Sequence, residues 1–330
     1  MIRMEKPFSR FGTAWLTGTV ILSVAAVVYA REKNIPVWAA IPIAAAFLVE
    51  FPFYLLPGFE SVRNAIDRSF SRPQLAFVLC VSGLLPYLIY SLGTGQFRWR
   101  ELAGLAAIAA TVSYWYVILP SAAVTDALFL ALFGVVILTK VFQRIYTAPV
   151  PHLPHLQVDT LGHLMLIRLT IMVLLLIRRV HGIGFGWIPS RREFFVGLQY
   201  FLYFLPIGLP LAWFLGLLRI HAHSNVLWQI IAVGLGIFWV VSLSEEFLFR
   251  GVLQQWIARW TGSRAAALVL TSLCYGLAHL WVKPFPNWQM ALVGSVLGVF
   301  CGLAYWKAHS VRASMVSHAL VATAFRILLS

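Results

Sequence analysis

Long apolar runs separated by short polar segments make up this chain. Each run is close to the roughly 20 residues that a helix needs to cross a bilayer. The runs do not alternate apolar and polar positions with a period of two, which excludes the strands of a membrane barrel. The pattern predicts an all-α protein, a polytopic transmembrane helical bundle of about 10–11 spans. The runs are residues 12–30, 36–57, 74–94, 101–119, 123–142, 160–178, 194–218, 226–256, 264–282, 287–306 and 310–328.

Composition agrees with a membrane protein. Hydrophobic residues fill 61% of the 330 positions and charged residues 11%, whereas a soluble domain is about 25% charged. The net charge of +14 would suggest nucleic-acid binding in a soluble protein. Here most lysines and arginines lie between the apolar runs, where they set topology and contact anionic lipid head groups. We expect the lipid bilayer as a partner, and no nucleic acid.

The distribution of basic residues also predicts an orientation. Lysine and arginine are more frequent on the side of the membrane that carries the N-terminus than on the other side, if the runs cross in turn. The positive-inside rule then predicts an N-terminus inside the cell. We expect an integral, multi-pass protein of the cytoplasmic (inner) membrane.

The segment 179–193 divides the chain. It is rich in glycine, basic and aromatic residues, and most of the chemically unusual positions follow it. We predict N-terminal transmembrane helices of unknown role over 1–179 and a second domain over 180–330. Glu50 and Arg168 are polar exceptions in the first part. We expect them to snorkel or to pair with each other or with a lipid; a functional role for Glu50 is the alternative.

Two adjacent carboxylates and an arginine interrupt the apolar run 226–256. A charge at the bilayer centre costs about 2.5–3.5 kcal/mol on insertion scales, so Glu245, Glu246 and Arg250 need a reason to be there. On a helix, Glu246 and Arg250 share a face in the favourable order, while Glu245 points about 100° away. Arg250 can therefore neutralise Glu246 and leave Glu245 as a general base. The alternative is a structural ion pair, which leaves Glu245 unexplained.

Two histidines lie inside later apolar runs, His279 in 264–282 and His318 in 310–328. Taken singly, each is more typical of a hydrogen-bonded core histidine. Tyr275 precedes His279 by one helical turn, so its ring is expected to wall the site against water. Ionisable groups that converge within a membrane indicate a functional site. The candidate catalytic residues are Glu245, Glu246, Arg250, His279 and His318.

This set of residues fits the attack of water on an amide. Two histidines and a glutamate could hold zinc, but the spacing is not that of a His-Glu-x-x-His site. Without a metal, a carboxylate can deprotonate water while imidazoles stabilise the oxyanion or protonate the amine. We expect no cofactor, with zinc as the less favoured alternative. Cys274 next to Tyr275 has no spacing that supports a cysteine nucleophile, and no serine lies in a Gly-x-Ser-x-Gly elbow.

The motifs Glu245-Glu246-x-x-x-Arg250, Tyr275-x-x-x-His279 and His318 resemble the CPBP family. Its members are CAAX prenyl proteases and bacteriocin-processing enzymes, also called Abi or type II CAAX proteases. The resemblance covers roughly residues 180–330 and implies an intramembrane catalytic domain there. It implies a glutamic-type endopeptidase that hydrolyses a peptide bond of a membrane-associated or lipidated protein or peptide.

The resemblance also implies a role for each residue. Glu245 would activate the water, Glu246 and Arg250 would orient it and hold the helix, His279 would position the water or assist proton transfer, and His318 would stabilise the oxyanion. The family pattern has Phe where this chain has Tyr275, and Asn where it has Ala322. An oxyanion donor is therefore missing at Ala322.

Two other functions compete with the protease. Because of Ala322, the chain could be a catalytically weak or inactive scaffold or immunity factor on the same fold. The ionisable cluster could also relay protons in a transporter. Helices broken at mid-membrane and inverted halves would favour the transporter, and neither is visible in the sequence.

Overall fold

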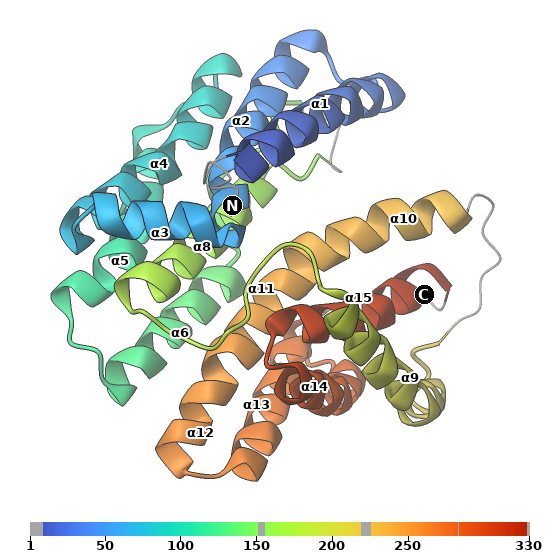
Figure 1. Ribbon diagram of the computed structural model, residues 1–330. Helices are drawn as coiled ribbons and strands as arrows, with labels where there is room; N and C mark the ends of the chain where they lie inside the picture. Colours follow the sequence, from blue (N-terminus) through green and yellow to red (C-terminus); the bar gives the residue numbers. More distant parts are fainter. Residues whose placement is uncertain (1–8, 151–155, 219–225, 283, 329–330) are drawn as a thin grey trace, which may run out of the picture. The chain divides into compact units, whose positions relative to one another are not determined.

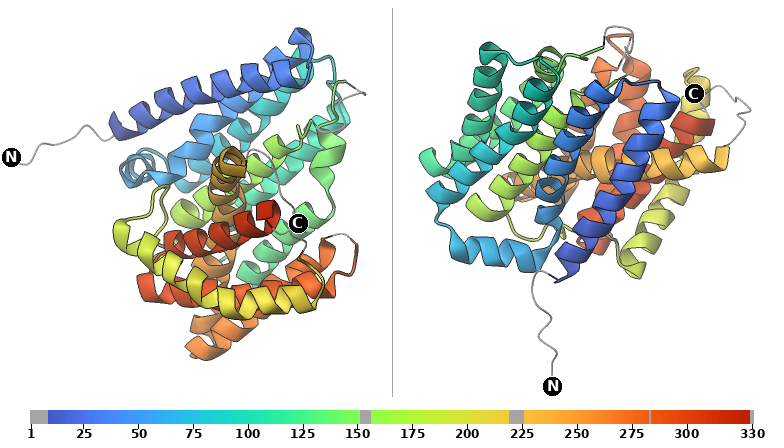
Figure 2. Two further views of the ribbon diagram at one scale, coloured as in Figure 1. Left: turned by 90° about the vertical axis from the view of Figure 1, so that its right-hand side faces the viewer. Right: turned by 90° about the horizontal axis from the view of Figure 1, so that it is seen from above.

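The computed structural model describes residues 9–150, 156–218, 226–282 and 284–328, and the regular structure within these ranges is helical (Figure 1). The predicted all-α polytopic bundle is confirmed. Contacts divide the chain into two compact units, Met1–Arg179 and Val180–Ser330. Figure 2 gives two further views of the helices.

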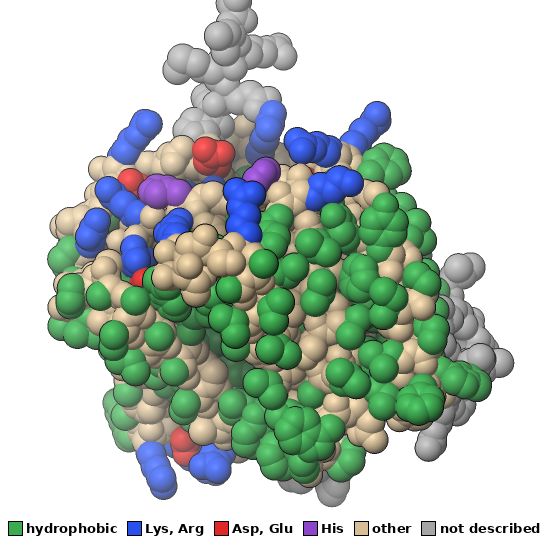
Figure 3. Space-filling model, turned by 90° about the horizontal axis from the view of Figure 1, so that it is seen from below, with side chains coloured by type: hydrophobic (Ala, Val, Ile, Leu, Met, Phe, Trp, Pro, Cys, Tyr) green, Lys and Arg blue, Asp and Glu red, His purple; other side chains and the backbone are tan. Residues whose placement is uncertain are grey.

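Seven helical stretches in the described ranges are long and apolar enough to cross a membrane. The chain is therefore a multi-pass integral membrane protein. Other predicted spans are shorter, such as α6 (Ala123–Leu138) with 16 residues and α13 (Arg264–Ala278) with 15. Apolar side chains cover much of the face in Figure 3, as expected for helices that contact lipid. The seven stretches are Ser9–Glu32, Val37–Gly58, Arg72–Gly93, Trp99–Ile118, Thr160–Ile177, Arg191–Phe214 and Trp288–Ala308.

The first unit is organised around α8 (Thr160–Met172), which a π-helical segment, η2 (Val173–Ile177), extends. It packs against α2 (Val37–Leu55), α4 (Arg72–Gly93) and α5 (Trp99–Ile118). The remaining elements are α1 (Ser9–Glu32), η1 (Leu56–Gly58), α3 (Glu60–Ser69), α6 and α7 (Val141–Ile145). The short charged helix α3 lies between two predicted spans and was not predicted as an element.

Arg168 and Glu50 form a buried ion pair inside the first unit. Nε of Arg168 on α8 lies 2.5 Å from Oε1 of Glu50 on α2. The terminal nitrogens of Arg168 donate to the hydroxyl and the carbonyl oxygen of Ser82 on α4, at 3.0 and 2.9 Å. The sequence left open whether these residues snorkel, bind lipid or pair with each other, and in the structure they pair with each other. The pair and its bonds to Ser82 link α2, α4 and α8.

The second unit is packed around α14 (Trp288–Ala308) and α15 (Val311–Leu328). Both contact α9 (Arg191–Phe214), and α14 also packs along α13. A core cluster joins Phe204 of α9, Tyr275 of α13, Leu297 and Cys301 of α14 and Val321 of α15. Side chains from four helices therefore meet where the candidate residues lie.

The run 226–256 is not one regular α-helix as predicted. It is a continuous helical path of α10 (Val226–Gly236), π-helical η3 (Ile237–Ser242), α11 (Leu243–Glu246), π-helical η4 (Phe247–Gln254) and α12 (Gln255–Thr261). The path bends between α10 and α12 (Figure 1), as helices do at π-bulges. The two glutamates sit on the four-residue α-turn between the π-helical segments, a setting that is frequent at functional sites.

Glycines bring α13 and α14 close together. A Cβ atom on Gly298 of α14 would lie 2.9 Å from Cα of Ser272 on α13. Gly276 of α13 likewise faces the backbone of Ala291 on α14. Helices in membranes approach most closely through such small residues. These close contacts therefore set the position of α13, which carries Tyr275 and is capped by His279.

The segment 180–190 packs onto the start of α15. The carbonyl oxygen of Ile183 accepts a hydrogen bond from the amide of Val311 at 3.0 Å, and that of Gly184 accepts one from the Ser310 hydroxyl at 2.9 Å. Gly184 has a φ of +64° and lies against the Ser310 backbone, so a larger residue would not fit there. This segment fixes the helix that carries His318.

Candidate active site

Glu246 and Arg250 form the fully buried centre of the site. Oε1 of Glu246 accepts a hydrogen bond from a terminal nitrogen of Arg250 at 2.9 Å, and neither side chain is exposed. The other terminal nitrogen of Arg250 donates to the carbonyl oxygen of Gly298 at 3.2 Å. The pairing expected from the four-residue spacing is present, and Arg250 also ties this helix to α14.

His318 joins the pair from α15. Its Nδ1 lies 2.8 Å from Oε1 of Glu246. A carboxylate that pairs with arginine is ionised and only accepts hydrogen bonds, so Nδ1 carries the proton. When the ring is neutral, Nε2 is then a hydrogen-bond acceptor. Glu246 therefore fixes the orientation and the tautomer of His318. A carboxylate that bonds to one ring nitrogen commonly has this effect on an imidazole.

Glu245 is the second carboxylate of the cluster and has no cation beside it among the described residues. Its Oε2 lies 3.9 Å from Nε2 of His318, which is beyond hydrogen-bond distance. Among the described residues, this oxygen accepts no hydrogen bond. The Glu245 side chain is 32% exposed, against 0% for Glu246. The structure thus separates a fully enclosed, ion-paired glutamate from one whose side chain is partly exposed, although its Oε2 atom is itself buried.

Tyr275 connects the two histidines. Its hydroxyl lies 3.4 Å from Nε2 of His318, and its ring centroid lies 4.8 Å from that of His279. Nδ1 of His279 lies 2.9 Å from the Tyr275 carbonyl oxygen, so Nδ1 donates and Nε2 is again the acceptor nitrogen. His279 caps the end of α13 and packs over Gly294 of α14.

The structure brings all five candidate residues into one cluster. Glu245, Glu246, Arg250 and His318 touch or nearly touch one another, and His279 joins them through the Tyr275 ring. The roles assigned to them stay predictions. Within the described residues, no three His, Cys, Asp or Glu side chains are arranged to hold a metal ion. The expectation of a metal-free site also stays a prediction.

Two features of the site were missed at the sequence level. The Tyr275 hydroxyl lies within reach of His318, whereas the sequence only predicted that the Tyr275 ring would shield the site from water. The replacement of the family's Phe by Tyr could have indicated this contact. Gln254 lies one turn beyond Arg250, is fully buried, and donates to the carbonyl oxygen of Gly302 at 3.3 Å. A polar residue that continues the Glu246–Arg250 face was the signal for it.

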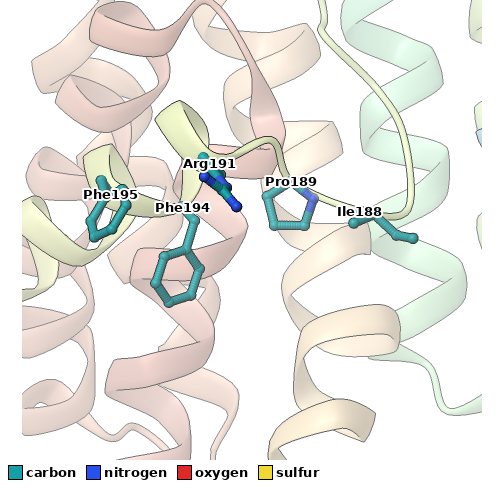
Figure 4. Close-up of a pocket in the computed structure, with 5 residues that line it drawn as sticks. All are labelled: Ile188, Pro189, Arg191, Phe194 and Phe195. Carbon is teal, nitrogen blue, oxygen red and sulfur yellow. The ribbon is translucent and has the colours of Figure 1, made fainter.

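A surface pocket lies apart from this cluster. It is at the start of α9, and Figure 4 shows its lining of Ile188, Pro189, Arg191, Phe194 and Phe195. None of the candidate site residues is among these five. The pocket therefore adds nothing to the chemistry of the site.

Residues 226–324 match the family model described as type II CAAX prenyl endopeptidase, Rce1-like. This range is similar to the Rce1-like family. The Rce1-like range contains all five candidate residues together with Tyr275 and Ala322, and the resemblance to the CPBP family is confirmed there. Comparison with curated proteins and with solved structures gives no match to the chain.

Proposed function

We propose that the protein is an intramembrane endopeptidase of glutamic type. It hydrolyses a peptide bond of a membrane-associated or lipidated protein or peptide. The Rce1-like match supports a CAAX-type protease at the level of the family. The assignment of residues to steps and the nature of the substrate are our own proposals.

One observation carries the proposal, namely the unequal surroundings of the two adjacent glutamates. Glu246 accepts hydrogen bonds from Arg250 and His318, so its charge is balanced and its position fixed. Glu245 has a free carboxylate oxygen 3.9 Å from an acceptor nitrogen of His318. Oε2 of Glu245 and Nε2 of His318 are both acceptors at this distance. A water molecule between them could donate one of its two O–H groups to each. A general base must lie within reach of the proton that it removes.

The reaction then follows from these groups. Glu245 removes a proton from water as the water oxygen bonds to the carbonyl carbon, and the carbonyl π electrons become an oxyanion. Glu246 and Arg250 hold His318 toward the water. When the oxyanion collapses, the C–N bond breaks and the proton on Glu245 passes to the leaving amine. His279, held by its hydrogen bond to the Tyr275 carbonyl, borders the site and assists this transfer.

The continuous helix favours this function over the transporter alternative. Carriers place ion sites at helices that are unwound at mid-membrane. Residues 226–261 keep helical geometry through both π-helical segments. The glutamates therefore sit on a helix and not on a loop, which positions a catalytic pair more precisely. The inside N-terminus and the cytoplasmic membrane remain part of the proposal.

The test is Glu245→Gln in the full-length protein in proteoliposomes. The substrate is an internally quenched peptide with an S-prenylated C-terminal CAAX sequence. We expect cleavage to fall by at least about 10³-fold, because the amide cannot accept the proton. The unfolding midpoint should change little, since Oε2 of Glu245 accepts no hydrogen bond among the described residues and lies 3.9 Å from Nε2 of His318. Undiminished cleavage by this variant would mean that Glu245 is not the base; no cleavage by the wild type would favour the inactive scaffold.

A further inference from the structure

The ring of Tyr275 is held without any help from its hydroxyl. Cζ of Arg250 lies 4.3 Å from the ring centroid, and the Phe249 ring packs perpendicular to it at 5.1 Å. The imidazoles of His279 and His318 lie at centroid distances of 4.8 and 5.9 Å. The residue is 1% exposed. A phenylalanine would keep every one of these contacts, so the hydroxyl is not needed for packing.

The hydroxyl itself is buried with a weak hydrogen bond. Its partner among the described residues is Nε2 of His318 at 3.4 Å, whereas hydroxyl donors usually lie about 2.7–2.8 Å from the acceptor. Placing a hydroxyl in an apolar interior without a good partner is unfavourable. Tyr275 therefore retains a donor that the resting protein barely uses.

The ionisable side chains around Glu245 already use most of their N–H donors, although Nε of Arg250 has no hydrogen-bond partner among the described residues. Both histidines carry their proton on Nδ1, which is bonded to Glu246 in one case and to a backbone carbonyl in the other. Their Nε2 atoms are acceptors unless a ring takes up a second proton. The terminal nitrogens of Arg250 already donate to Glu246 and Gly298. A phenol, in contrast, keeps its proton at neutral pH.

We propose that the Tyr275 hydroxyl is a catalytic hydrogen-bond donor of this site. In the resting protein the hydroxyl donates weakly to Nε2 of His318. During hydrolysis it donates instead to the oxyanion that forms when water adds to the substrate carbonyl. It donates a hydrogen bond and keeps its proton, so the proton still moves from water to Glu245 and on to the amine. This inference rests on the proposed function and names the donor that the methyl group of Ala322 cannot supply.

Tyr305 provides a matched control in the same unit. It is also a buried tyrosine, but its hydroxyl is well bonded: it accepts from Nε2 of Gln255 at 2.5 Å and donates to the Gly182 carbonyl at 3.0 Å. Removing that hydroxyl takes away both hydrogen bonds, although Nε2 of Gln255 keeps its bond to the Gly251 carbonyl at 2.8 Å, and this loss lowers stability. Removing the Tyr275 hydroxyl removes one weak bond. The two Tyr→Phe variants should therefore affect different properties.

The experiment compares Tyr275→Phe and Tyr305→Phe in the full-length protein with the S-prenylated CAAX peptide. For Tyr275→Phe we expect kcat to fall about 100-fold, the usual effect of losing one oxyanion donor. KM should change less than about twofold, because the lost contact forms only in the transition state. Its unfolding midpoint should stay within about 2 °C of the wild type. Tyr305→Phe should keep kcat and show a lower midpoint.

The outcomes separate this inference from the proposed function. A wild-type kcat in Tyr275→Phe overturns the inference, as does a loss of kcat that is matched by Tyr305→Phe or by a drop in midpoint. If Glu245→Gln is inactive in the same series, the protease proposal survives that result. If the wild-type protein does not cleave the peptide, both proposals fail.

Discussion

Arg250 keeps a carboxylate charged where there is no water to solvate it. The Glu246–Arg250 pair is completely buried, and removing one partner of such a pair leaves an uncompensated charge. That loss typically costs about 3–5 kcal/mol, whereas replacing both partners with neutral groups costs far less. At the scale of single residues, the pair is thus a condition for folding as well as a support for His318.

Arg250→Met should therefore be strongly destabilised, by about 3–5 kcal/mol. The double variant Glu246→Gln/Arg250→Met should recover part of this loss, because it no longer buries a lone charge. Chemical unfolding in detergent, followed by intrinsic fluorescence, measures both. Equal stabilities for the single and the double variant would argue against a charged Glu246.

At this scale the sequence predicted side-chain contacts within one helix but not the contacts between helices. Glu246 pairs with Arg250 because residues four apart meet on a helix, and this spacing is visible in the sequence. That His318 bonds to Glu246, with Glu245 at 3.9 Å, depends on how α15 packs against α11. The reach of the Tyr275 hydroxyl depends in the same way on the distance between α13 and α15.

Among the elements, the contact between α13 and α14 positions half of the site. Gly298→Ala should destabilise the protein by about 1–3 kcal/mol, because the new methyl would overlap the Ser272 backbone and push the helices apart. Activity should fall too, since Tyr275 and His279 would move with α13. Gly236→Ala is the control, because a Cβ there meets nothing within 4 Å. Thermal unfolding and peptide cleavage are the measurements; equal behaviour of the two variants would contradict this view of the contact.

Most helices could be predicted from apolar runs, since a bilayer demands long hydrophobic helices. The π-helical segments η3 and η4 could not, because Ile237–Ser242 and Phe247–Gln254 have the composition of ordinary helices. The widened turns arise from packing with neighbouring helices. Helix α3 was missed for the opposite reason: Glu60–Ser69 is short and charged, so it lacks the signal of a span.

On the scale of the whole molecule, the candidate site belongs to one unit. All five candidate residues and Tyr275 lie within Val180–Ser330, and the buried pair of Glu50 and Arg168 lies within Met1–Arg179. The apolar content and the segment 179–193 pointed to two membrane parts. The role of the first part could not be predicted, because its buried carboxylates form ion pairs within the unit, Glu50 with Arg168 and Asp126 with Arg178.

Arg168→Met tests this division of roles. It leaves Glu50 charged and unpaired inside the first unit, so stability should fall by about 3–5 kcal/mol. The kcat of the molecules that remain folded should equal that of the wild type, because no candidate residue lies in this unit. Active-site titration together with steady-state cleavage gives kcat per folded molecule. A kcat as low as that of Glu245→Gln would show that the first unit takes part in the chemistry.

The balance of charge around Glu246 has a consequence for which peptides can be cut. Arg250 cancels Glu246, and both imidazoles are neutral in the tautomers described, so the cluster keeps one negative charge, on Glu245. A peptide with Asp or Glu beside the scissile bond would bring a like charge into a medium that screens it poorly. Sequences with neutral or basic residues at those positions meet no such repulsion. For the proposed protease, we therefore expect the unpaired Glu245 to disfavour acidic residues beside the cleavage site.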